Sequence, residues 1–497
     1  MNIFLFYIGT PTPILETKLE LIRKHEQLGD FVRVLQCTGN LPNCGKNRNH
    51  KNSQCAMCRS KFKNGWQLLS PGEKVELKEI PFENVEISEL PLVFNSVDDI
   101  KKYQTDGENI GYGIASTLIS VLRDHRFNTK KYHNDVILEL STSLKVYKAL
   151  KREFEEFKPD RVYIFNGRVG THLPAMLLCK KLGIEYVTIE VANKKNSYRL
   201  TKNSTPHEPV PIEDVDLLRS NWTSAQAHLA DLFYKKKRDG EDFENILHYI
   251  RGQKKGTLPK SFNVNKKNIA IFNGTIDEYA AIEGWNPMYE PDETAGIGKI
   301  LESFYADDYM FYLRVHPHLK EVASSTSQLL DIRALAHKFK NLHVIWPEED
   351  VDTYALIDAC EKIITFGSTV GAEATYWGKP SILAGYATYK KFDCVYTPNS
   401  HEELIKLVRS ELKPLPVECA LQYAFWEISN GIPYKYFKQN GFRNGLAYGT
   451  FDGVVIRSNA VPIIWNRIDI MFERFKRIIN NPSLILRKLM YLGKRKI

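Results

Sequence analysis

Four apolar segments in the second half of the chain are each followed directly by polar residues of types that bind ligands. Residues 273–275 (Asn-Gly-Thr) follow NIAIF, and residues 316–318 (His-Pro-His) follow YMFYLRV. Residues 347–350 (Pro-Glu-Glu-Asp) follow LHVIW, and residues 367–369 (Gly-Ser-Thr) follow KIITF. If these segments are parallel strands, their carboxyl ends meet at one edge of a sheet, where ligands bind in open α/β sheets. The sequence therefore predicts one binding crevice formed by the four clusters.

The turn after KIITF, in the segment FGSTVGAEATYWGKP, has a composition suited to a phosphate. Gly367 and Gly371 let the backbone approach a ligand closely. Ser368 and Thr369 supply hydroxyl groups, and a helix that begins near Val370 offers N–H groups and a partial positive charge. We expect this turn to hold the phosphate or pyrophosphate of a ligand.

Arg314 and Glu373 are two charged residues that we expect at this edge. Arg314 is the only charge on an otherwise apolar strand, where it is costly unless paired. An anionic ligand would pair it, and so would an internal partner such as Glu348. Glu373 lies one turn into the predicted helix, where it either accepts hydrogen bonds from ribose hydroxyls or caps the helix in the S/T-x-x-E manner. The sequence leaves both alternatives open for each residue.

A second group of reactive residues lies near the start of the chain, where Cys37, Cys44, Cys55 and Cys58 form a C-x6-C-x10-C-x2-C pattern. The final CxxC lets the thiolates of Cys55 and Cys58 reach one ion, and the longer spacer lets the chain bring Cys37 and Cys44 to the same ion. Four sulfur ligands suit zinc or an iron–sulfur cluster. We predict a metal held by these four cysteines in a loop at residues 37–58. Reduced thiols and disulfides are the alternatives, and His50 is a possible substitute ligand.

The elements that must position these residues alternate between strand-like and helical patterns in both halves of the chain. Their strands are almost continuously apolar, which favours parallel sheets covered on both faces. A basic, glycine-containing stretch at about 231–264 is the expected connection between the halves. We predict an α/β protein with two doubly wound Rossmann-like domains, at residues 1–260 and 261–420, that face a cleft. Residues 421–497 are expected to form C-terminal helices.

Composition and charge restrict the class of protein. The 497 residues exceed what one hydrophobic core usually serves, and 43% hydrophobic with 26% charged residues is typical of a folded protein. No run reaches the roughly 18 apolar residues of a membrane span, and MNIFLFYIG lacks the flanks of a signal peptide. The net charge is +9, and residues 467–497 carry +7 of it. A uniformly basic nucleic-acid binder would not distribute its charge in this way, so no nucleic-acid partner is expected.

The basic C-terminal segment RIDIMFERFKRIINNPSLILRKLMYLGKRKI places apolar residues at helical spacing with basic residues between them. This pattern predicts an amphipathic helix that lies on an anionic membrane surface. The alternative is a helix docked on the first domain with a solvated basic face. We therefore expect a cytoplasmic protein that is peripheral at the inner face of the cell membrane.

The stretch from about 268 to 400 resembles the C-terminal domain of GT-B glycosyltransferases. It is most similar to the capsule and lipopolysaccharide synthesis group that includes bacterial polysialyltransferases and Kdo transferases. His316-Pro317 match the His-Pro motif of that group, and Ser368, Thr369 and Glu373 match its Ser/Thr-rich turn and helix. Asn273-Gly274 stand where such proteins often have two serines. The resemblance implies a nucleotide-sugar donor (UDP-, GDP- or CMP-linked) bound by these residues: Asn273, Gly274, Thr275, Arg314, His316, Pro317, Gly367, Ser368, Thr369, Val370 and Glu373.

The same resemblance implies an inverting, metal-independent transfer of the sugar to a lipid-linked or oligosaccharide acceptor in capsule or O-antigen synthesis. Such a transfer needs a general base to deprotonate the acceptor hydroxyl. We expect Glu190, at the end of the strand IEYVTIE, to be this base, with His172, Asp277 and Glu278 as competitors. Asp-x-Asp pairs at 214/216 and 350/352 are the alternative for chemistry with a bound divalent ion.

Other functions remain as alternatives at the level of sequence. Teichoic-acid polymerases share the His-Pro and Ser-turn features, so transfer of an alditol phosphate is one of them. A non-catalytic binding subunit of a polysaccharide assembly complex is another. A nucleic-acid protein with a zinc knuckle fits less well, because basic residues near the cysteines are not interleaved with aromatic ones.

Overall fold

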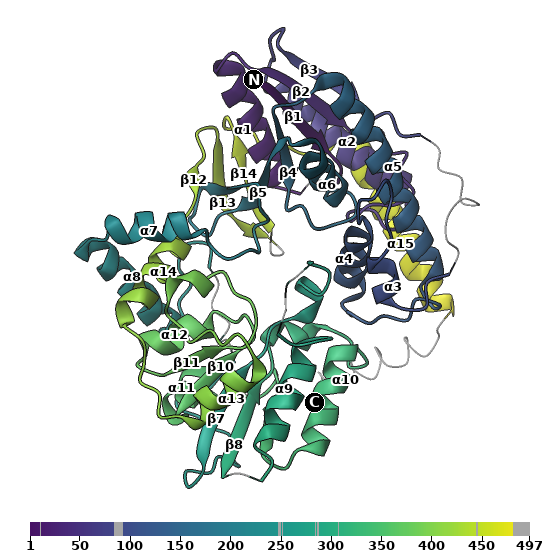
Figure 1. Ribbon diagram of the computed structural model, residues 1–497. Helices are drawn as coiled ribbons and strands as arrows, with labels where there is room; N and C mark the ends of the chain where they lie inside the picture. The colour runs from purple at the N-terminus through teal and green to yellow at the C-terminus, as the bar shows by residue number, and fades with distance from the viewer. Residues whose placement is uncertain are drawn as a thin grey trace, which may run out of the picture. The chain divides into compact units, whose positions relative to one another are not determined.

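The computed structural model of the chain (Figure 1) describes residues 1–9, 11–83, 93–246, 250, 252–283, 285, 288–306, 308–443 and 446–480. The chain divides into two compact units. Unit 1 comprises Met1–Asn84, Lys151–Asp160 and Lys435–Ile497, and unit 2 comprises Val85–Leu150 and Arg161–Tyr434. The fold is α/β, as the sequence predicts. The predicted domain limits at 260 and 420 remain a prediction.

Unit 2 contains a five-stranded sheet in which every neighbouring pair of strands is parallel. Its strands are β7 (Lys267–Phe272), β8 (Tyr309–Arg314), β9 (Leu342–Ile345), β10 (Lys362–Thr365) and β11 (Ser381–Leu383), in the order β11-β10-β7-β8-β9. Phe272 lies opposite both Arg314 and Thr365 in the register, so β7, β8 and β10 end side by side. The polar residues that follow these three strands therefore start from the same edge of the sheet.

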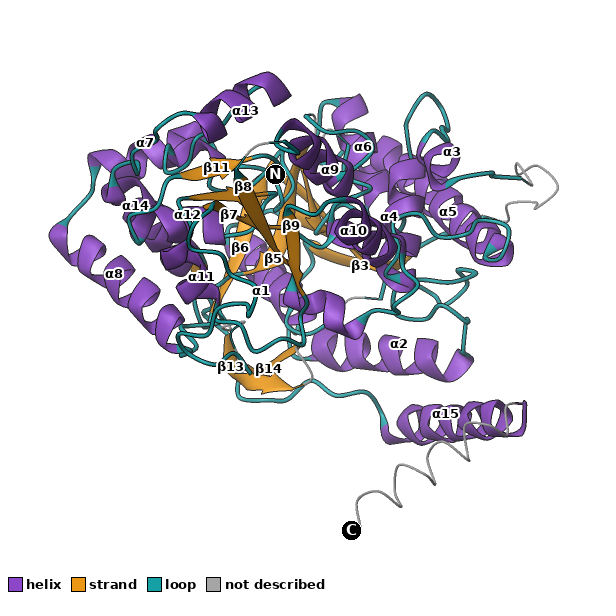
Figure 2. Cartoon of the chain, turned by 90° about the horizontal axis from the view of Figure 1, so that it is seen from below, coloured by secondary structure: helices purple, strands orange, loops and turns teal. Residues whose placement is uncertain are grey.

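Both faces of this sheet are covered, because alternate side chains of each strand enter different clusters of buried residues. Ile269 and Ile271 of β7 pack with α9 (Glu293–Ser303), α10 (Ser327–Lys338) and α13 (His401–Arg409). Ala270 and Phe272 pack with α11 (Thr353–Ala359) and α12 (Val370–Tyr376). Figure 2 shows α9 and α10 on one side of the strands and α11 and α12 on the other. Burial on both faces explains the near-continuous apolar strands.

Three further helices pack against α12 and the loop after β11. They are α7 (Ile212–Ser220), α8 (Ser224–Asp239) and α14 (Val417–Ser429). Phe233 and Tyr234 of α8 enter a buried cluster with Ala372 of α12, and Tyr234 donates to the backbone oxygen of Ala420. The sequence predicted an inter-domain connection from about residue 231. The structure corrects this start, because α8 continues as a packed helix to residue 239.

The other strands of unit 2 form a mixed arrangement. β4 (Arg161–Phe165) pairs parallel with β5 (Glu185–Val191), whereas β6 (Ser197–Lys202) and β12 (Ile432–Pro433) pair antiparallel. The helix α6 (Leu173–Leu182) ends at Gly183, which has a φ of 68°, as expected for a glycine that closes a helix. The remaining elements of this part are α3 (Val97–Lys101), α4 (Gly111–Leu122) and the short 3-10 helices Ile276–Glu278, Pro317–Glu321 and Lys390–Phe392. The helix α5 (His133–Phe157) belongs to unit 2 up to residue 150 and to unit 1 from residue 151.

Unit 1 is built on the parallel strands β1 (Asn2–Tyr7), β2 (Phe31–Gln36) and β3 (Val75–Glu79). Its helices α1 (Ile14–Gln27) and α2 (Asn52–Gln67) follow β1 and β2, and β13 (Phe437–Arg443) pairs antiparallel with β14 (Leu446–Phe451). Cys55 and Cys58 lie on α2. The predicted loop at residues 37–58 therefore ends in a helix.

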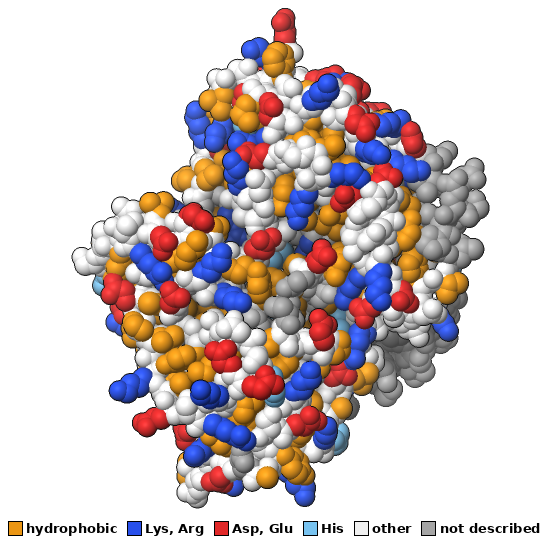
Figure 3. Space-filling view, in the orientation of Figure 1, with side chains coloured by type: hydrophobic (Ala, Val, Ile, Leu, Met, Phe, Trp, Pro, Cys, Tyr) orange, Lys and Arg blue, Asp and Glu red, His pale blue; other side chains and the backbone are white. Residues whose placement is uncertain are grey.

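The predicted C-terminal amphipathic helix begins as α15 (Ala460–Asn480), which packs against α2 and accepts a hydrogen bond from Ser53 on Asp469. Its other face exposes apolar side chains at helical spacing: Val461, Ile464, Trp465, Ile468 and Met471. Residues 481–497, with five of the basic residues of the predicted tail, lie outside the described part. No helix of the described residues is long and apolar enough to span a membrane. Figure 3 shows one face of the molecule, on which acidic and basic side chains are interspersed.

Candidate functional site

A cavity of about 350 Å³ opens in unit 2 where β7, β8 and β10 end. Its wall includes all eleven residues predicted to bind a donor, which come from residues 273–275, 314–317 and 367–373. Three of the four predicted polar clusters therefore converge at one site, because their strands are parallel and end in register.

The fourth predicted cluster, at residues 347–350, does not line the cavity. Glu349 closes its own turn by accepting the backbone N–H of Trp346 at 2.7 Å. Its place is taken by groups that the sequence did not indicate: Pro206, His207, Lys237, Gln253, Trp285, Thr353, Tyr354 and Tyr386. These come from α8, α11 and the loops between elements. Their roles depend on tertiary packing, which leaves no local pattern in the sequence.

Arg314 is the most unusual group on the cavity wall. It ends β8, it is 4% exposed, and its Nε and Nη1 atoms are buried with no hydrogen-bond acceptor among the described residues. Burial lowers the pKa of Arg314, and the carboxylates of Glu349 and Asp352 act in the opposite direction from outside ion-pair distance. Glu348 is not its partner. A buried guanidinium without an acceptor is costly, and an anion in the cavity would offset that cost.

The glycines of the turn after β10 are required by packing within the protein. Gly367 has a φ of 110°, and a Cβ there would lie 2.9 Å from the backbone oxygen of Tyr386. A Cβ at Gly371 would lie 2.4 Å from the hydroxyl of Tyr389. From the sequence we expected these glycines to let a ligand approach the backbone. The structure shows that they also leave room for the loop after β11, which carries Tyr386 and Tyr389.

The helix start offers fewer free N–H groups than the sequence predicts. The N–H of Val370 donates to Ser368 Oγ, that of Gly371 to the Ser368 oxygen, and that of Ala372 to the Thr369 oxygen. These N–H groups are therefore paired within the turn, and the expectation that they are free to bind a phosphate is wrong for these three residues. The hydroxyl-bearing side chains of Ser368 and Thr369 still line the cavity.

Glu373 does not cap the helix in the predicted way, because Thr369 makes no side-chain bond to the helix N–H groups. The Glu373 carboxylate is 3% exposed and accepts from Lys237 Nζ at 2.7 Å and from Tyr354 Oη at 2.8 Å. Thr369 Oγ1 donates to it at 3.0 Å. It therefore joins α8, α11 and α12 beneath the cavity.

His316 and Glu278 place one neutral and one negative group on the wall. Burial lowers the pKa of His316 to about 4, so the imidazole is neutral at pH 7. Burial acts to raise the pKa of Glu278, but His318 and His316 outweigh it and lower the value to about 2. His318 Nδ1 lies 3.6 Å from Glu278 Oε1, and this contact raises the pKa of His318.

None of the three predicted catalytic residues lines the cavity. Glu190 accepts from Asn166 Nδ2 at 2.9 Å, and Asn166 lies 3.3 Å from Nε2 of His207, which does line it. His172 is buried against Phe165, with Nδ1 at 3.0 Å from Thr171 Oγ1. Asp277 forms a 2.9 Å ion pair with Arg123. Two side chains, Asn166 and His207, thus connect Glu190 to the cavity. The carboxylate of Glu278, the residue next to Asp277, does line the cavity.

Three aromatic rings form one side of the cavity. Tyr279 and Trp285 are stacked with ring centres 5.2 Å apart, and Trp285 and Tyr386 lie 5.0 Å apart. Flat apolar surfaces of this kind suit a nucleobase or the apolar face of a sugar. Tyr279 is fixed by a hydrogen bond to Glu293.

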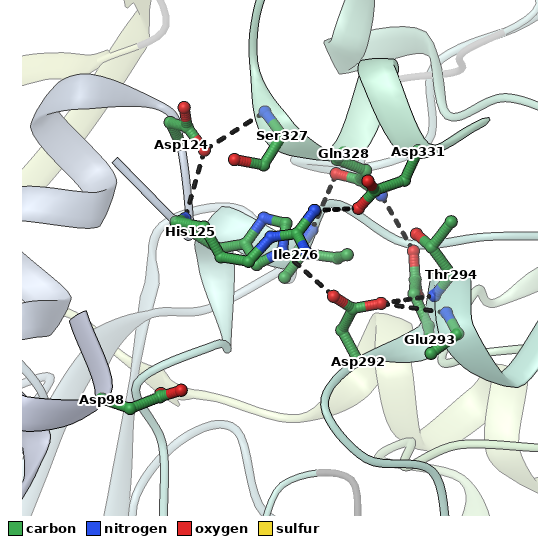
Figure 4. Close-up of polar contacts among 12 residues, drawn as sticks. Asp98, Asp124, His125, Ile276, Asp292, Glu293, Thr294, Ser327, Gln328 and Asp331 are labelled. Atoms are coloured by element: carbon green, nitrogen blue, oxygen red, sulfur yellow. Dashed lines mark hydrogen bonds and ion pairs between the residues drawn. The ribbon is translucent and has the colours of Figure 1, made fainter. Parts of the chain in front are cut away.

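Glu293 is a buried carboxylate that holds the loop after β7 in place. It is 1% exposed and accepts from the Gly274 N–H at 3.1 Å, from Gln328 Nε2 at 2.9 Å and from Tyr279 Oη. Gln328 also donates to the Gly274 oxygen at 3.0 Å. Figure 4 shows Glu293 and Gln328 beside each other. Burial raises the pKa of Glu293 to about 7.

A polar cluster next to Glu293 joins residues 123–126 to α9 and α10 (Figure 4). His125 Nε2 lies 3.1 Å from Asp292 Oδ2, and Arg126 pairs with Asp331. The ligand atoms of His125, Asp292 and Asp331 lie within 4.8 Å of one another. Asp292 also caps α9 by accepting the N–H groups of Thr294 and Ala295. Each carboxylate already has a cationic or N–H partner, and these contacts hold residues 123–126 against α9 and α10.

The predicted Asp-x-Asp pair at 350/352 also has a structural role. Asp352 caps α11 through the N–H of Tyr354 at 2.9 Å and accepts the Gly256 N–H at 2.7 Å. Neither Asp350 nor Asp352 lines the cavity. The site geometry therefore does not use this pair.

Comparisons with known proteins agree with the sequence resemblance. Residues 232–401, which include β7 to β11, match the family described as capsule polysaccharide biosynthesis protein. The resemblance to the capsule synthesis group is confirmed for this part of the chain. No curated protein matches the chain.

Solved structures that match the chain do so at low identity. The KpsC β-Kdo 2,4-transferase of Thermosulfurimonas dismutans is 16% identical, with 59% of this chain and 84% of that chain covered and a TM-score of 0.31. The KpsC β-Kdo 2,7-transferase is 12% identical over 61% and 86%, with a TM-score of 0.33. The UDP-GlcNAc 2-epimerase of Neisseria meningitidis is 12% identical over 85% and 98%, with a TM-score of 0.22.

Replacement of Glu293 by Gln tests the buried carboxylate. The raised pKa means that the folded state binds a proton between about pH 4.5 and 7 that the unfolded chain releases, so stability falls as pH rises through this window. Relative to the wild type, Glu293→Gln should gain about 2 kcal/mol of unfolding free energy between pH 5.5 and pH 8.

Denaturant unfolding at both pH values measures this gain. Glu302→Gln, at an exposed position of the same helix, is the control and should show no pH-dependent difference. An equal effect of Glu293→Gln at both pH values would contradict the raised pKa.

Proposed function

We propose that the chain is a glycosyltransferase of bacterial capsule polysaccharide synthesis that binds a nucleotide-sugar donor in the cavity of unit 2. The observation that carries the proposal is the buried guanidinium of Arg314, which has no acceptor among the described residues and reaches the cavity wall. The match of residues 232–401 to the capsule family supports the same conclusion. The acceptor is proposed to be a lipid-linked or oligosaccharide chain.

The phosphate of the donor is proposed to lie between Arg314 and the hydroxyls of Ser368 and Thr369. These groups would stabilise the negative charge that develops on the leaving phosphate. His316, neutral at pH 7, can donate a hydrogen bond to the same oxygens. The aromatic rings of Trp285 and Tyr386 would contact the base or the sugar.

In the proposed inverting transfer, an acceptor oxygen bonds to the anomeric carbon while the bond from that carbon to the phosphate oxygen breaks. The proton of the acceptor hydroxyl goes to a carboxylate. Glu190 is the proposed base, connected to the cavity through Asn166 and His207. Glu278 is the rival, since it lines the cavity, but its low pKa makes it a weak base.

The exposed apolar stripe of α15 is proposed to bind an anionic membrane surface. Trp465 and Met471 are each 64% exposed, and Val461 is 61% exposed, on a helix whose other face packs on α2. Basic residues of this segment would attract acidic lipid headgroups. Such binding would bring the enzyme to a lipid-linked acceptor.

Arg314→Gln should weaken nucleotide binding while the protein stays folded. Hydrogen bonds to charged groups contribute about 1.5–3 kcal/mol, so the dissociation constant of the best ligand among UDP, GDP, CMP and CDP should rise roughly 10- to 100-fold. Titration calorimetry measures it. Arg333→Gln, on α10 and away from the cavity wall, is the control. Failure of every nucleotide to bind the wild type would contradict the proposed function.

Glu190→Gln and Glu278→Gln distinguish the two proposed bases. Loss of a general base should reduce turnover by about 10²- to 10⁴-fold and leave nucleotide affinity unchanged. We expect this loss of turnover for Glu190→Gln. A loss found only with Glu278→Gln assigns the base to Glu278, and full turnover in both variants contradicts both assignments.

The double variant Ile464→Ser, Trp465→Ser should reduce binding to vesicles rich in anionic lipid at least several-fold, because it removes two exposed apolar side chains from the stripe. Sedimentation with vesicles of anionic and of neutral lipid measures the effect. Leu217→Ser, at a position of α7 that is also 64% exposed, is the control. Unchanged sedimentation of the double variant would overturn the membrane proposal.

A further inference from the structure

The four cysteines of residues 37–58 gather at the carboxyl ends of β1 and β2 in unit 1. Cys37 directly follows β2, and its N–H donates to the backbone oxygen of Tyr7, the last residue of β1. Cys55 and Cys58 lie one turn apart on α2, which follows β2 in the chain. This edge is where open parallel sheets bind their ligands.

N–H groups lie close to all four sulfurs, and two of the sulfurs accept a hydrogen bond from one. The Gly39 N–H donates to Cys37 Sγ at 3.4 Å, and Asn47 Nδ2 donates to Cys55 Sγ at 3.1 Å. The backbone N–H groups of Lys46 and Asn47 lie near Cys44 Sγ, and that of Gly9 lies near Cys58 Sγ. Hydrogen bonds to the cysteine sulfurs are one of the features that tune iron–sulfur clusters. An ordinary buried cysteine behaves as a small apolar side chain and needs no such donors.

Positive side chains surround the same sulfurs. Lys46 interacts electrostatically with Cys44 and Cys58, and Lys61 interacts with Cys58. Gly9 has a φ of 58°, and a Cβ there would lie 3.3 Å from Cys44 Sγ, so the backbone approaches the sulfurs closely. A bound group with several thiolate ligands carries net negative charge, which these lysines complement.

The spacing of the sulfurs distinguishes between the possible occupants. The four cysteines are close enough to interact electrostatically with one another, and all four are free of disulfides. Yet no three of their sulfurs lie within 4.8 Å of one another among the described residues. A tetrahedral zinc ion with bonds of about 2.3 Å would hold its sulfurs about 3.8 Å apart. In a four-iron cluster each cysteine binds a different iron, so the sulfurs stand farther apart.

We propose that the four cysteines of residues 37–58 bind a [4Fe–4S] cluster. The site is independent of the proposed donor cavity, which lies in unit 2. Each iron would have one cysteine ligand, so no iron is left open for a substrate. The role of the cluster would be to fix residues 37–58 across the carboxyl ends of β1 and β2.

Protein purified without oxygen tests this proposal. The wild type should contain about four irons and four acid-labile sulfides per chain and be brown. Cys44→Ser and Cys58→Ser should each lose most of the iron. Cys419→Ser, at a half-buried cysteine of unit 2, is the matched control and should keep it.

Because the two serine variants can fail to fold, the metal content of the wild type decides the result first. One zinc per chain without iron, or no metal at all, would overturn the proposal. Iron that persists in both variants would overturn the assignment of the ligands. Nucleotide binding measured on the same samples reports on the donor cavity separately, so failure of one proposal does not imply failure of the other.

Discussion

The cavity of unit 2 is organised around one group, the buried guanidinium of Arg314. A positive charge at the end of a central strand, 4% exposed and without an acceptor among the described residues, is a cost that the fold carries until an anion binds. The parallel register places Arg314 beside Phe272 and brings the turns after β7 and β10 to the same edge. The charge and the polar turns thus form one anion site because the strands run in the same direction.

Buried carboxylates organise the walls of this site. Glu373 joins α8, α11 and α12 through Lys237, Tyr354 and Thr369, and Glu293 holds the loop after β7 and the ring of Tyr279. Each has several donors, so the charge of each is distributed over hydrogen bonds within the protein. Arg314 differs from both in having buried nitrogen atoms with no partner in the part of the chain that the structure describes. Fixed walls around one uncompensated charge are the arrangement expected of a preorganised phosphate site.

Much of this edge can be predicted from the sequence, because it follows from local pattern. Apolar runs identify β7, β8 and β10, and the residues directly after them are the wall of the cavity. What sequence reasoning missed depends on packing between distant segments. Lys237 was assigned to a connection, and Glu293 carried no motif, since its partners lie at positions 274, 279 and 328. Sequence reasoning also missed the hydrogen bonds within the turn at 368–372 and the helix that carries Cys55, because both depend on the folded chain.

The most direct measurement is a crystal structure of the protein with the nucleotide that binds best. We expect a phosphate within hydrogen-bond distance of the Arg314 guanidinium and close to the hydroxyls of Ser368 and Thr369. A nucleotide bound elsewhere, with Arg314 still lacking an acceptor, would contradict the assignment of this cavity as the donor site.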